Sequence, residues 1–242
     1  MSSVLITGAN RGLGLEFTRQ YLKDGWEVHA FCRRPDKAAE LGAMVADSRG
    51  NIHLRQMDIG NKEQIEAAAK ELKNLPIDLL INNAGIADGY GRGVYEMKED
   101  PDIQNYDFAF WEEMMRINTL APAKIIGAFL ENIRAGGQKK IASLSSGLGS
   151  ITNLAWAGKY GYCASKAGLN MVSKGLAEWL KSENIIVKNS IYLLHPSPDG
   201  LKMLVQNELL LISTQFRKLS RLNLKKLKVC LSSNPMIKKN IL

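Results

Sequence analysis

Strand-like and helix-like segments alternate along the first 195 residues of this chain, and few architectures accommodate that pattern. Helices repeat apolar residues every three to four positions, whereas strands buried on both faces are short continuous apolar runs. The predicted strands are residues 3–7, 26–31, 52–56, 77–81, 140–144 and 185–193. The predicted helices are residues 11–23, 35–46, 62–72 (with Asn61 as N-cap), 105–134 and 160–181. This order predicts βαβ units, and hence an α/β fold with one doubly wound parallel sheet flanked by helices.

Composition excludes several classes of protein. Hydrophobic residues make up 45% and charged residues 23% of the 242, which excludes disordered and collagen-like chains. No apolar run reaches the ~18 residues of a membrane-spanning helix, and the N-terminus lacks a signal-peptide pattern. We therefore expect a cytoplasmic protein with no stable membrane insertion. The cysteines and histidines are scattered, which predicts neither a disulfide framework nor a metal site: Cys32, Cys163, Cys230, His29, His53 and His195.

The net charge of +8 lies almost entirely at the C-terminus. Residues 196–242 contain nine Lys or Arg and two acidic residues, a net charge of +7, so residues 1–195 carry only +1. Because the main body is nearly neutral, we do not expect a nucleic-acid partner.

A glycine-rich turn, TGANRGLG at residues 7–14, joins the first strand to the first helix. Glycine lets the backbone approach a pyrophosphate closely, and the helix N-terminus offers unpaired N–H groups. The position after a strand and before a helix predicts a dinucleotide site on a Rossmann-type sheet; the alternative is a tight turn that binds nothing. The turn residues expected to hold the cofactor are Gly8, Asn10, Arg11, Gly12, Leu13 and Gly14.

The end of the second strand indicates which dinucleotide binds. A NAD site usually carries an acid there, which bonds the ribose 2′-OH. This strand instead ends Cys32-Arg33-Arg34, and the first acid is Asp36. Guanidinium groups at Arg33, Arg34 and Arg11 suit a 2′-phosphate, so we expect NADP(H) in preference to NAD(H). The alternative is that Arg33 and Arg34 are solvated surface charges.

Tyr162 and Lys166 open the last predicted helix, and their spacing of four residues places them on one helix face. A free phenol, with a pKa near ~10, is a poor acid or base at neutral pH, and a nearby ammonium lowers that pKa. Ser145 and Ser146 end a strand, at the edge where such sheets bind ligands. A Tyr–Lys pair alone usually has no function, so its assignment depends on the other motifs.

Together these motifs resemble the short-chain dehydrogenase/reductase family: TGANRGLG, then NNAG at residues 82–85, then YCASK at residues 162–166. Longer stretches are similar to its C-factor/sniffer-like carbonyl reductase branch: ITGANRGLGLEF at 6–17, PIDLLINNAGI at 76–86, SSGLGSI at 145–151 and YCASKAGLNM at 162–171. The resemblance covers about residues 3–196. It implies hydride transfer between a nicotinamide and a small carbonyl or alcohol substrate, in a homodimer or homotetramer.

The resemblance also implies four catalytic roles. Tyr162 would be the general acid in carbonyl reduction, and Lys166 would lower its pKa and hydrogen-bond the nicotinamide ribose. Ser146, preferred to Ser145 because it stands three residues before a glycine, would hold the carbonyl oxygen. Asn118 would hold a water in the proton relay; without the other motifs it is a mid-helix Asn with no role.

Further cofactor contacts are implied at the ends of other strands. Asp58 matches the acid that contacts the adenine. Asn83, Ala84 and Gly85 match the segment that packs along the adenosine. The implied cofactor site also includes Ile59, Tyr162, Lys166 and Pro196.

The sequence departs from the family's pattern at its C-terminus. Where the family has Pro-Gly and then an aliphatic residue and a threonine that clamp the nicotinamide carboxamide, residues 196–201 read PSPDGL. We therefore expect a dinucleotide-binding and catalytic domain over residues 1–196, whose last strand is missing or altered, and an atypical basic segment over residues 197–242. Residues 201–212 predict a lid helix. The basic amphipathic pattern beyond suits a membrane surface, an acidic partner, a helix packed on the body or a poorly ordered end.

Two functions stay open. The first is an active NADP(H)-dependent carbonyl reductase, which Asn118, Ser146, Tyr162 and Lys166 favour. The second is a catalytically impaired dinucleotide-binding protein that acts by binding, with a truncated or frame-shifted C-terminus, which the altered clamp favours.

Overall fold

The computed structural model describes residues 1–87, 103–154, 158–197 and 200–205. The chain divides into two compact units, Met1–Ile191 and Tyr192–Leu242. The first unit contains every predicted site residue except Pro196.

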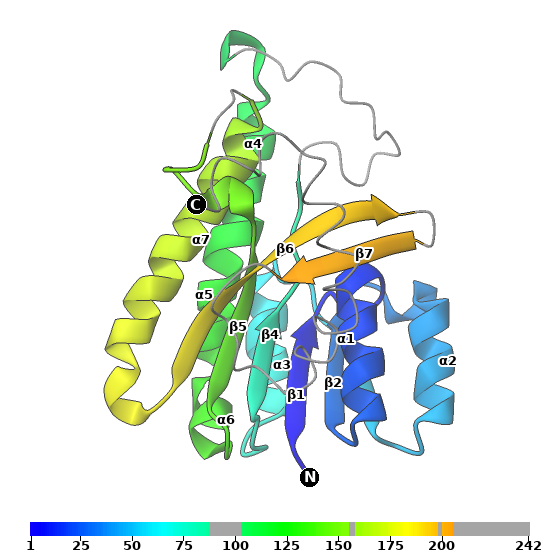
Figure 1. Ribbon diagram of the computed structural model, residues 1–242. Coiled ribbons are helices and arrows are strands. Elements are labelled where there is room, and N and C mark those ends of the chain that lie inside the picture. Colours follow the sequence, from blue (N-terminus) through cyan, green and yellow to red (C-terminus); the bar gives the residue numbers. More distant parts are fainter. Residues whose placement is uncertain (88–102, 155–157, 198–199, 206–242) are drawn as a thin grey trace, which may run out of the picture. The chain divides into compact units, whose positions relative to one another are not determined.

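The first unit is built on six parallel strands in the order β3-β2-β1-β4-β5-β6 (Figure 1). Their bounds are β1 Ser3–Thr7, β2 Glu27–Cys32, β3 Ile52–Gln56, β4 Leu79–Asn82, β5 Lys140–Ser145 and β6 Ile186–Ser197. Only the part of β6 as far as Ile191 pairs with β5. The predicted doubly wound parallel sheet is confirmed. The strand order reverses between β1 and β4, which is where open α/β sheets bind ligands.

Helices cover both faces of this sheet. Their bounds are α1 Gly12–Lys23, α2 Ala39–Asp47, α3 Lys62–Glu71, α4 Phe108–Met115, α5 Ala121–Ala128, α6 Leu130–Ala135 and α7 Tyr160–Trp179. On one face α1 and α2 pack against β1, β2 and β3. On the other, residues of α3, α5 and α6 join one apolar cluster with the strands. Asn61 caps α3 as predicted, its side chain accepting a hydrogen bond from the N–H of Gln64.

The predicted helix over residues 105–134 is interrupted. A π turn, Arg116–Leu120, joins α4 to α5, and Phe129 separates α5 from α6. Pro122 explains the π turn, because proline has no N–H to donate and its ring clashes with the carbonyl four residues earlier, that of Asn118. The predicted helix over residues 35–46 is also divided, since Ala38 adopts φ −95° and ψ 60° between the short 3-10 helix Pro35–Lys37 and α2.

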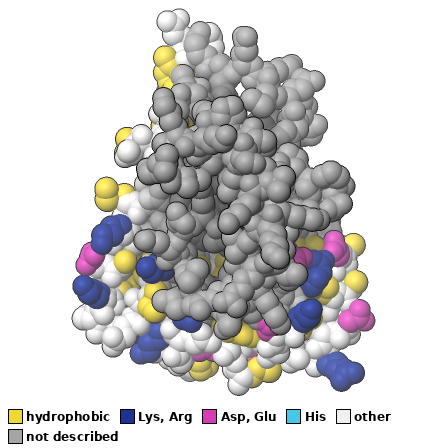
Figure 2. Space-filling model, in the orientation of Figure 1, with side chains coloured by type: hydrophobic (Ala, Val, Ile, Leu, Met, Phe, Trp, Pro, Cys, Tyr) yellow, Lys and Arg dark blue, Asp and Glu magenta, His cyan; other side chains and the backbone are white. Residues whose placement is uncertain are grey.

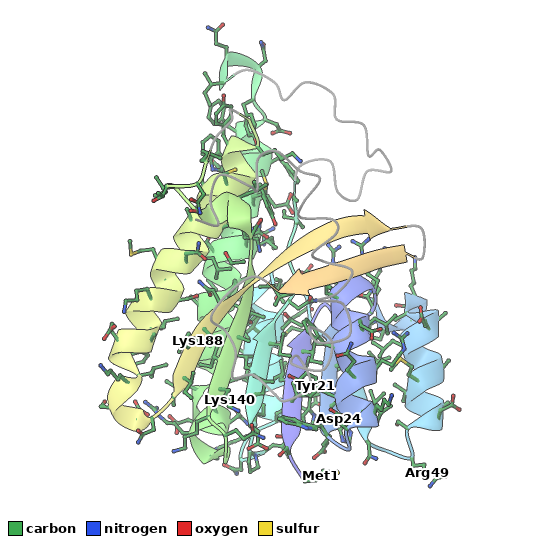
Figure 3. All side chains as sticks on the ribbon, in the orientation of Figure 1. Met1, Tyr21, Asp24, Arg49, Lys140 and Lys188 are labelled. Atoms are coloured by element: carbon green, nitrogen blue, oxygen red, sulfur yellow. The ribbon has the colours of Figure 1, made fainter. Side chains whose placement is uncertain are left out.

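The core is aliphatic and contains few aromatic rings. Phe31 of β2 packs edge-to-face on Phe129, with ring centres 6.3 Å apart. Tyr21 of α1 is 1% exposed and packs on Trp26. Side chains from helices and strands fill the space between the layers, with Tyr21 labelled (Figure 3). On β6 the burial is one-sided, because Val187 lies in the core whereas Ile186, on the opposite face, is 44% exposed.

Two of the histidines are not scattered in space. His29 of β2 and His53 of β3 are direct partners in the sheet, and their rings stack with centres 5.0 Å apart. The sequence spacing conceals this contact because α2 separates the two strands. The pKa of His29 is lowered to about 4, chiefly by burial; the Glu27 carboxylate opposes this shift, and the charges of Arg55 and His53 contribute to it. His29 is therefore neutral at pH 7.

In the second unit the chain forms a hairpin. Tyr192–Ser197 of β6 pairs antiparallel with β7, Gly200–Val205. The predicted lid helix is therefore wrong for residues 201–205; residues 206–212 lie outside the described part. The sequence Pro198-Asp199-Gly200 between two apolar runs is a turn signal, which explains the hairpin. No parallel seventh strand follows β6 among the described residues.

The described surface carries both signs of charge. On the face in Figure 2, basic and acidic side chains lie interspersed with hydrophobic and uncharged polar ones. This agrees with the near-neutral composition of residues 1–195. Within the described ranges, no helix has the length and apolar character needed to cross a bilayer.

Gly136→Ala is expected to lower the free energy of unfolding by about 2 kcal/mol, as overpacking does. A Cβ at Gly136, the residue after α6, would lie 2.1 Å from the carbonyl oxygen of Ile77. Its φ of −68° and ψ of 149° suit alanine, so the cost is steric alone. The control is Gly175→Ala in α7, where a Cβ meets no atom within 4 Å and where alanine should stabilise the helix by about 0.5 kcal/mol. Urea unfolding measures both; equal effects would contradict the close approach of Gly136 to the backbone of Ile77.

Candidate active site

The predicted site residues of the first unit gather at the carboxyl edge of its sheet. Thr7 ends β1, Asn82 ends β4 and Ser145 ends β5, on adjacent strands. The glycine turn follows Thr7 and leads into α1.

The glycine turn has the backbone that a phosphate cradle requires. Gly8 and Gly12 adopt φ of +66° and +56°, in the left-handed region. A Cβ at Gly14 would lie 2.2 Å from the carbonyl oxygen of Gly8, so only glycine allows this tight approach. A Cβ at Gly12 meets nothing within 4 Å, so open space adjoins the turn. The side chain of Arg11, the N-cap residue of α1, makes no capping hydrogen bond, which leaves the first N–H groups of α1 available to an anion. The turn therefore fits a dinucleotide pyrophosphate.

The NNAG segment holds this turn in place. The side-chain amide of Asn83 donates to the carbonyl oxygens of Thr7 at 2.8 Å and Gly8 at 3.1 Å. The hydroxyl of Thr7 accepts from the N–H groups of Asn83 at 3.0 Å and Ala84 at 3.1 Å. A Cβ at Gly85 would lie 3.0 Å from Oδ1 of Asn118 and 3.7 Å from Nζ of Lys166. Gly85 thus leaves room beside two of the predicted catalytic residues.

The glycine turn is also tied to the end of β2. The N–H of Ala9 donates to the carbonyl oxygen of Phe31 at 3.0 Å. Arg11 stands two residues after Ala9, and Arg33 stands two residues after Phe31; both arginines are exposed. Within the described part of the chain, Arg11, Arg33 and Arg34 form no ion pair. Asn10 and Leu13 are half-buried in the same turn.

The segment after β3 contributes Asp58 and Ile59. One carboxylate oxygen of Asp58 accepts from the N–H of Gly60 at 2.8 Å, and the N–H of Asp58 donates to Gln64. The side chain of Ile59 lies in the core cluster, so only its backbone is available to a ligand.

Tyr162 and Lys166 lie on the first turns of α7, with the Nζ of Lys166 5.7 Å from the centre of the Tyr162 ring. Lys166 is buried, and its Nζ donates to the carbonyl oxygen of Leu144 at 2.7 Å. An ammonium has three N–H donors, so two remain for other partners.

Burial dominates the pKa values of this pair. It raises the pKa of Tyr162 above 10.0, and a hydrogen bond with Ser146 opposes the shift. It lowers the pKa of Lys166 from 10.5 to about 8. In the chain without cofactor, burial thus determines the direction of the Tyr162 pKa, and the expected lowering by the nearby ammonium stays a prediction.

The two serines at the end of β5 have different partners. The hydroxyl of Ser145 is buried and donates to Oδ1 of Asn170 at 2.6 Å. The hydroxyl of Ser146 hydrogen-bonds the phenol of Tyr162 and accepts from the N–H of Leu148 at 3.2 Å. Ser146 is therefore the serine that lies beside the phenol.

Asn118 lies in the π turn, and its side chain is 1% exposed. Its Oδ1 accepts from the N–H of Ile86 at 2.9 Å, and its Nδ2 donates to the carbonyl oxygen of Ile86 at 2.7 Å and to the hydroxyl of Ser165 at 3.0 Å. Its backbone carbonyl has no helical donor at the usual position, because that position is Pro122. The carbonyl oxygen is thus the group of Asn118 with capacity for a water.

Sequence reasoning missed two residues of this site. Thr7 was placed at the start of the glycine turn without a role, although a hydroxyl directly before Gly8 was a readable signal. Asn170 also accepts from Nδ2 of Asn189 at 2.9 Å and donates to the carbonyl oxygen of Gly149 at 3.2 Å, so it fixes the loop that carries Ser146. Its signal was the four-residue series Tyr162, Lys166, Asn170 along one face of α7. Pro196 belongs to the second unit, where it pairs with Leu201.

Comparisons with known proteins agree with this geometry. The family model described as short chain dehydrogenase matches residues 2–192. The short-chain dehydrogenase/reductase atnB of Arthrinium sp is 34% identical over 200 residues, 76% of this chain and 71% of that protein. The NADPH-bound carbonyl reductase from chicken fatty liver is 30% identical with a TM-score of 0.67, over 78% of this chain and 74% of that one. The carbonyl reductase Sniffer of D. melanogaster is 27% identical with a TM-score of 0.69, over 78% and 79%.

Lys166→Met is expected to stabilise the protein at pH 7 by about 2 kcal/mol. A pKa lowered from 10.5 to about 8 corresponds to roughly 3 kcal/mol of desolvation cost, less about 1 kcal/mol for the lost hydrogen bond to Leu144. Between pH 8 and 10.5 the unfolded wild-type chain binds more protons than the folded one, so the stability of wild type rises with pH. The stability advantage of Lys166→Met over wild type therefore shrinks across this range and then reverses.

Urea unfolding at pH 7 and at higher pH measures this effect. The control is Lys174→Met, an exposed lysine of α7, for which a change within about 0.5 kcal/mol is expected. A Lys166→Met variant less stable than wild type at pH 7 would contradict the desolvation argument.

Proposed function

The chain belongs to the short-chain dehydrogenase/reductase family, which comprises NAD(P)-dependent oxidoreductases of carbonyl and alcohol substrates, and from this membership we propose that it is an NADP(H)-dependent carbonyl reductase. The observation that carries the proposal is the position of Tyr162, hydrogen-bonded to Ser146 and 5.7 Å from the ammonium of Lys166, at the sheet edge that bears the glycine turn.

The residues that would hold the cofactor lie along that edge. The N–H groups of Gly12, Leu13 and Gly14 would bind the pyrophosphate, with Gly8 and Asn10 completing the turn. The adenosine would lie along Asn83, Ala84 and Gly85, with Asp58 and the backbone of Ile59 at the adenine. Lys166 would reach the nicotinamide ribose with one of its free donors. Pro196 stays a predicted cofactor residue and belongs to the second unit.

The proposed mechanism uses the pKa values of the site. NADPH, when bound, supplies the hydride. Ser146 orients the substrate by donating a hydrogen bond to the carbonyl oxygen, and Tyr162 donates its phenolic proton to that oxygen as charge develops. A raised pKa keeps the phenol protonated at neutral pH, which suits a proton donor. Lys166 stabilises the phenolate that forms, and a water on the carbonyl oxygen of Asn118 returns the proton from solvent.

The preference for NADP(H) over NAD(H) follows from charge. Arg33 and Arg11 flank the point where the glycine turn meets β2, and no carboxylate pairs with them among the described residues. Guanidinium groups without a partner suit a 2′-phosphate. The similar carbonyl reductase from chicken fatty liver is NADPH-bound, which supports this preference.

We also propose a homodimer or homotetramer that associates through the α4–α6 region and α7. Large apolar side chains are exposed on both: Phe108 and Leu120 on the first, Met171 and Trp179 on the second. Such residues favour an interface between copies.

A second candidate function is a dinucleotide-binding protein without turnover. The observation in its favour is that the family match ends at residue 192, beside the boundary of the second unit, so the segment that would clamp the nicotinamide is atypical. Titration with NADPH, followed by a screen of aldehydes and ketones, separates the two candidates. Binding without turnover of any carbonyl would favour the second.

Tyr162→Phe is expected to lower kcat for carbonyl reduction by about 10³-fold and Ser146→Ala by about 10²-fold, with NADPH binding kept. Ser145→Ala is the matched control, because that hydroxyl bonds Asn170 instead of the phenol, and it should retain most of the activity. NADPH oxidation measures turnover and fluorescence titration measures binding. If Ser145→Ala were the more damaging serine variant, the assignment of Ser146 would be wrong.

Arg33→Ala is expected to weaken NADPH binding by about 10- to 100-fold and to leave NADH binding unchanged, because hydrogen bonds to charged groups contribute about 1.5–3 kcal/mol. Lys23→Ala, which removes the same charge at the opposite end of α1, is the control and should change neither affinity. Equal weakening of NADPH and NADH by Arg33→Ala would contradict recognition of the 2′-phosphate.

A further inference from the structure

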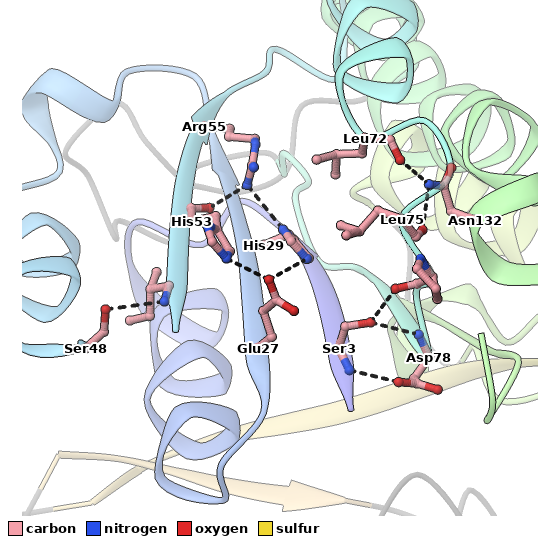
Figure 4. Close-up of polar contacts among 12 residues, drawn as sticks. Ser3, Glu27, His29, Ser48, His53, Arg55, Leu72, Leu75, Asp78 and Asn132 are labelled. Carbon is pink, nitrogen blue, oxygen red and sulfur yellow. Dashed lines mark hydrogen bonds and ion pairs between the residues drawn. The ribbon is translucent and has the colours of Figure 1, made fainter. Parts of the chain in front are cut away.

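A compact group of potential metal ligands lies on the outer strands of the sheet, away from the carboxyl edge. Glu27 opens β2, His29 follows two residues later on the same face, and His53 is the partner of His29 on β3. One ligand atom from each, a carboxylate oxygen and two imidazole nitrogens, lies within 4.8 Å of the others. Figure 4 shows both rings directed toward the Glu27 carboxylate.

One of these nitrogens is buried without a hydrogen bond. Nε2 of His29 has no hydrogen-bond partner among the described residues, although the side chain is only 1% exposed. It lies 3.9 Å from Oε1 of Glu27, too far for a hydrogen bond. A buried imidazole nitrogen normally has a partner, so this nitrogen is available to a ligand that can reach it.

The other two groups have freedom to move. The Glu27 side chain is 28% exposed and the His53 side chain 34%, and Nε2 of His53 lies 2.7 Å from Oε1 of Glu27. Tetrahedral ligands at ~2.0–2.1 Å from zinc are ~3.3 Å apart. The site would form if Glu27 moved about 0.6 Å from His53 and toward His29 and if the His53 ring, which is partly exposed, brought its nitrogen from within 4.8 Å of the His29 nitrogen to ~3.3 Å.

The Glu27 carboxylate is available to a cation. Arg55, whose charge acts on His29, donates from its Nε to Oε1 of Glu71 at 2.7 Å. Arg55 and Glu71 therefore neutralise each other, and the Glu27 carboxylate is left with only the two histidines as partners among the described residues.

We propose that Glu27, His29 and His53 form a binding site for a divalent transition metal such as Zn²⁺, with open coordination positions toward solvent. Two imidazoles and one carboxylate suit Zn²⁺, Co²⁺, Ni²⁺ or Cu²⁺, and not the all-oxygen preference of Mg²⁺ or Ca²⁺. The metal would join the edge strand β3 to β2. The site is independent of the proposed reductase activity.

The tautomer of His29 makes the proposal specific. Arg55 only donates hydrogen bonds, and its Nη1 lies 3.2 Å from Nδ1 of His29, so in the metal-free chain the ring proton is on Nε2. Metal binding at Nε2 moves that proton to Nδ1, where it faces the N–H of Arg55. Arg55 therefore opposes metal binding. When metal binding displaces the Arg55 guanidinium from Nδ1 of His29, its hydrogen bond to Glu71 is kept.

The test is a titration of the metal-free full-length chain with ZnCl₂ by calorimetry and with CoCl₂ by visible absorption. We expect one saturable site in wild type. His53→Gln and Glu27→Gln, chosen because both side chains are partly exposed and should fold, are expected to weaken binding at least about 10-fold. Arg55→Gln is expected to tighten it, because glutamine accepts from the Nδ1 proton. His195→Gln removes the remaining histidine and should change nothing.

The result that overturns the proposal is equal affinity in wild type, His53→Gln and Glu27→Gln, which would place the metal on other groups such as the cysteines. Absence of saturable binding in wild type overturns it as well. Circular dichroism of each variant distinguishes loss of a ligand from loss of the fold.

Discussion

The hydrogen bonds between Thr7 and the NNAG segment are the contacts on which the site depends. They join β1 to the end of β4, at the reversal of strand order where the two halves of the sheet meet. Asn83 completes the pairing by donating to the carbonyl oxygens of Thr7 and Gly8. The glycine turn and the segment beside the proposed catalytic residues are thereby held together, and neither can shift without breaking these partly buried hydrogen bonds.

The catalytic end of the site is held at a cost in stability. Lys166 is an ammonium buried beneath the sheet edge, with one carbonyl partner and a pKa lowered to about 8. Burial acts in the opposite direction on Tyr162, whose phenol stays protonated. In the proposed mechanism, one environment prepares both groups, the phenol as a proton donor and the ammonium as a charge that phenolate or an anionic cofactor would stabilise. A buried charge such as the Lys166 ammonium, which a ligand would stabilise, lowers the stability of the fold when no ligand is bound.

Sequence reasoning predicted the six parallel strands and the family, because continuous apolar runs and spaced glycine motifs are local signals. It missed features that depend on neighbours far along the chain. The division of residues 105–134 follows from Pro122, a local signal that the apolar spacing concealed. The pairing of His29 with His53 depends on strand register, and the direction in which the Tyr162 pKa shifts depends on burial. The spacing of residues in the sequence predicts neither feature. The prediction of a lid helix was wrong for residues 201–205, because the turn signal before Leu201 outweighed the apolar run after it.

The end of the family match and the boundary between the compact units coincide within one residue, although they rest on different properties. One is sequence similarity, which ends at residue 192, and the other is the density of contacts, which divides the chain after Ile191. The residues proposed for hydride transfer, Asn118, Ser146, Tyr162 and Lys166, all lie before this point. So do the phosphate turn and Arg33. All the residues proposed for hydride transfer therefore belong to the first unit, and the sequence that departs from the family's pattern after Pro196 belongs to the second unit. Activity with an ordinary NADPH affinity would mean that the departure is tolerated, whereas affinity without activity would place the defect at the nicotinamide.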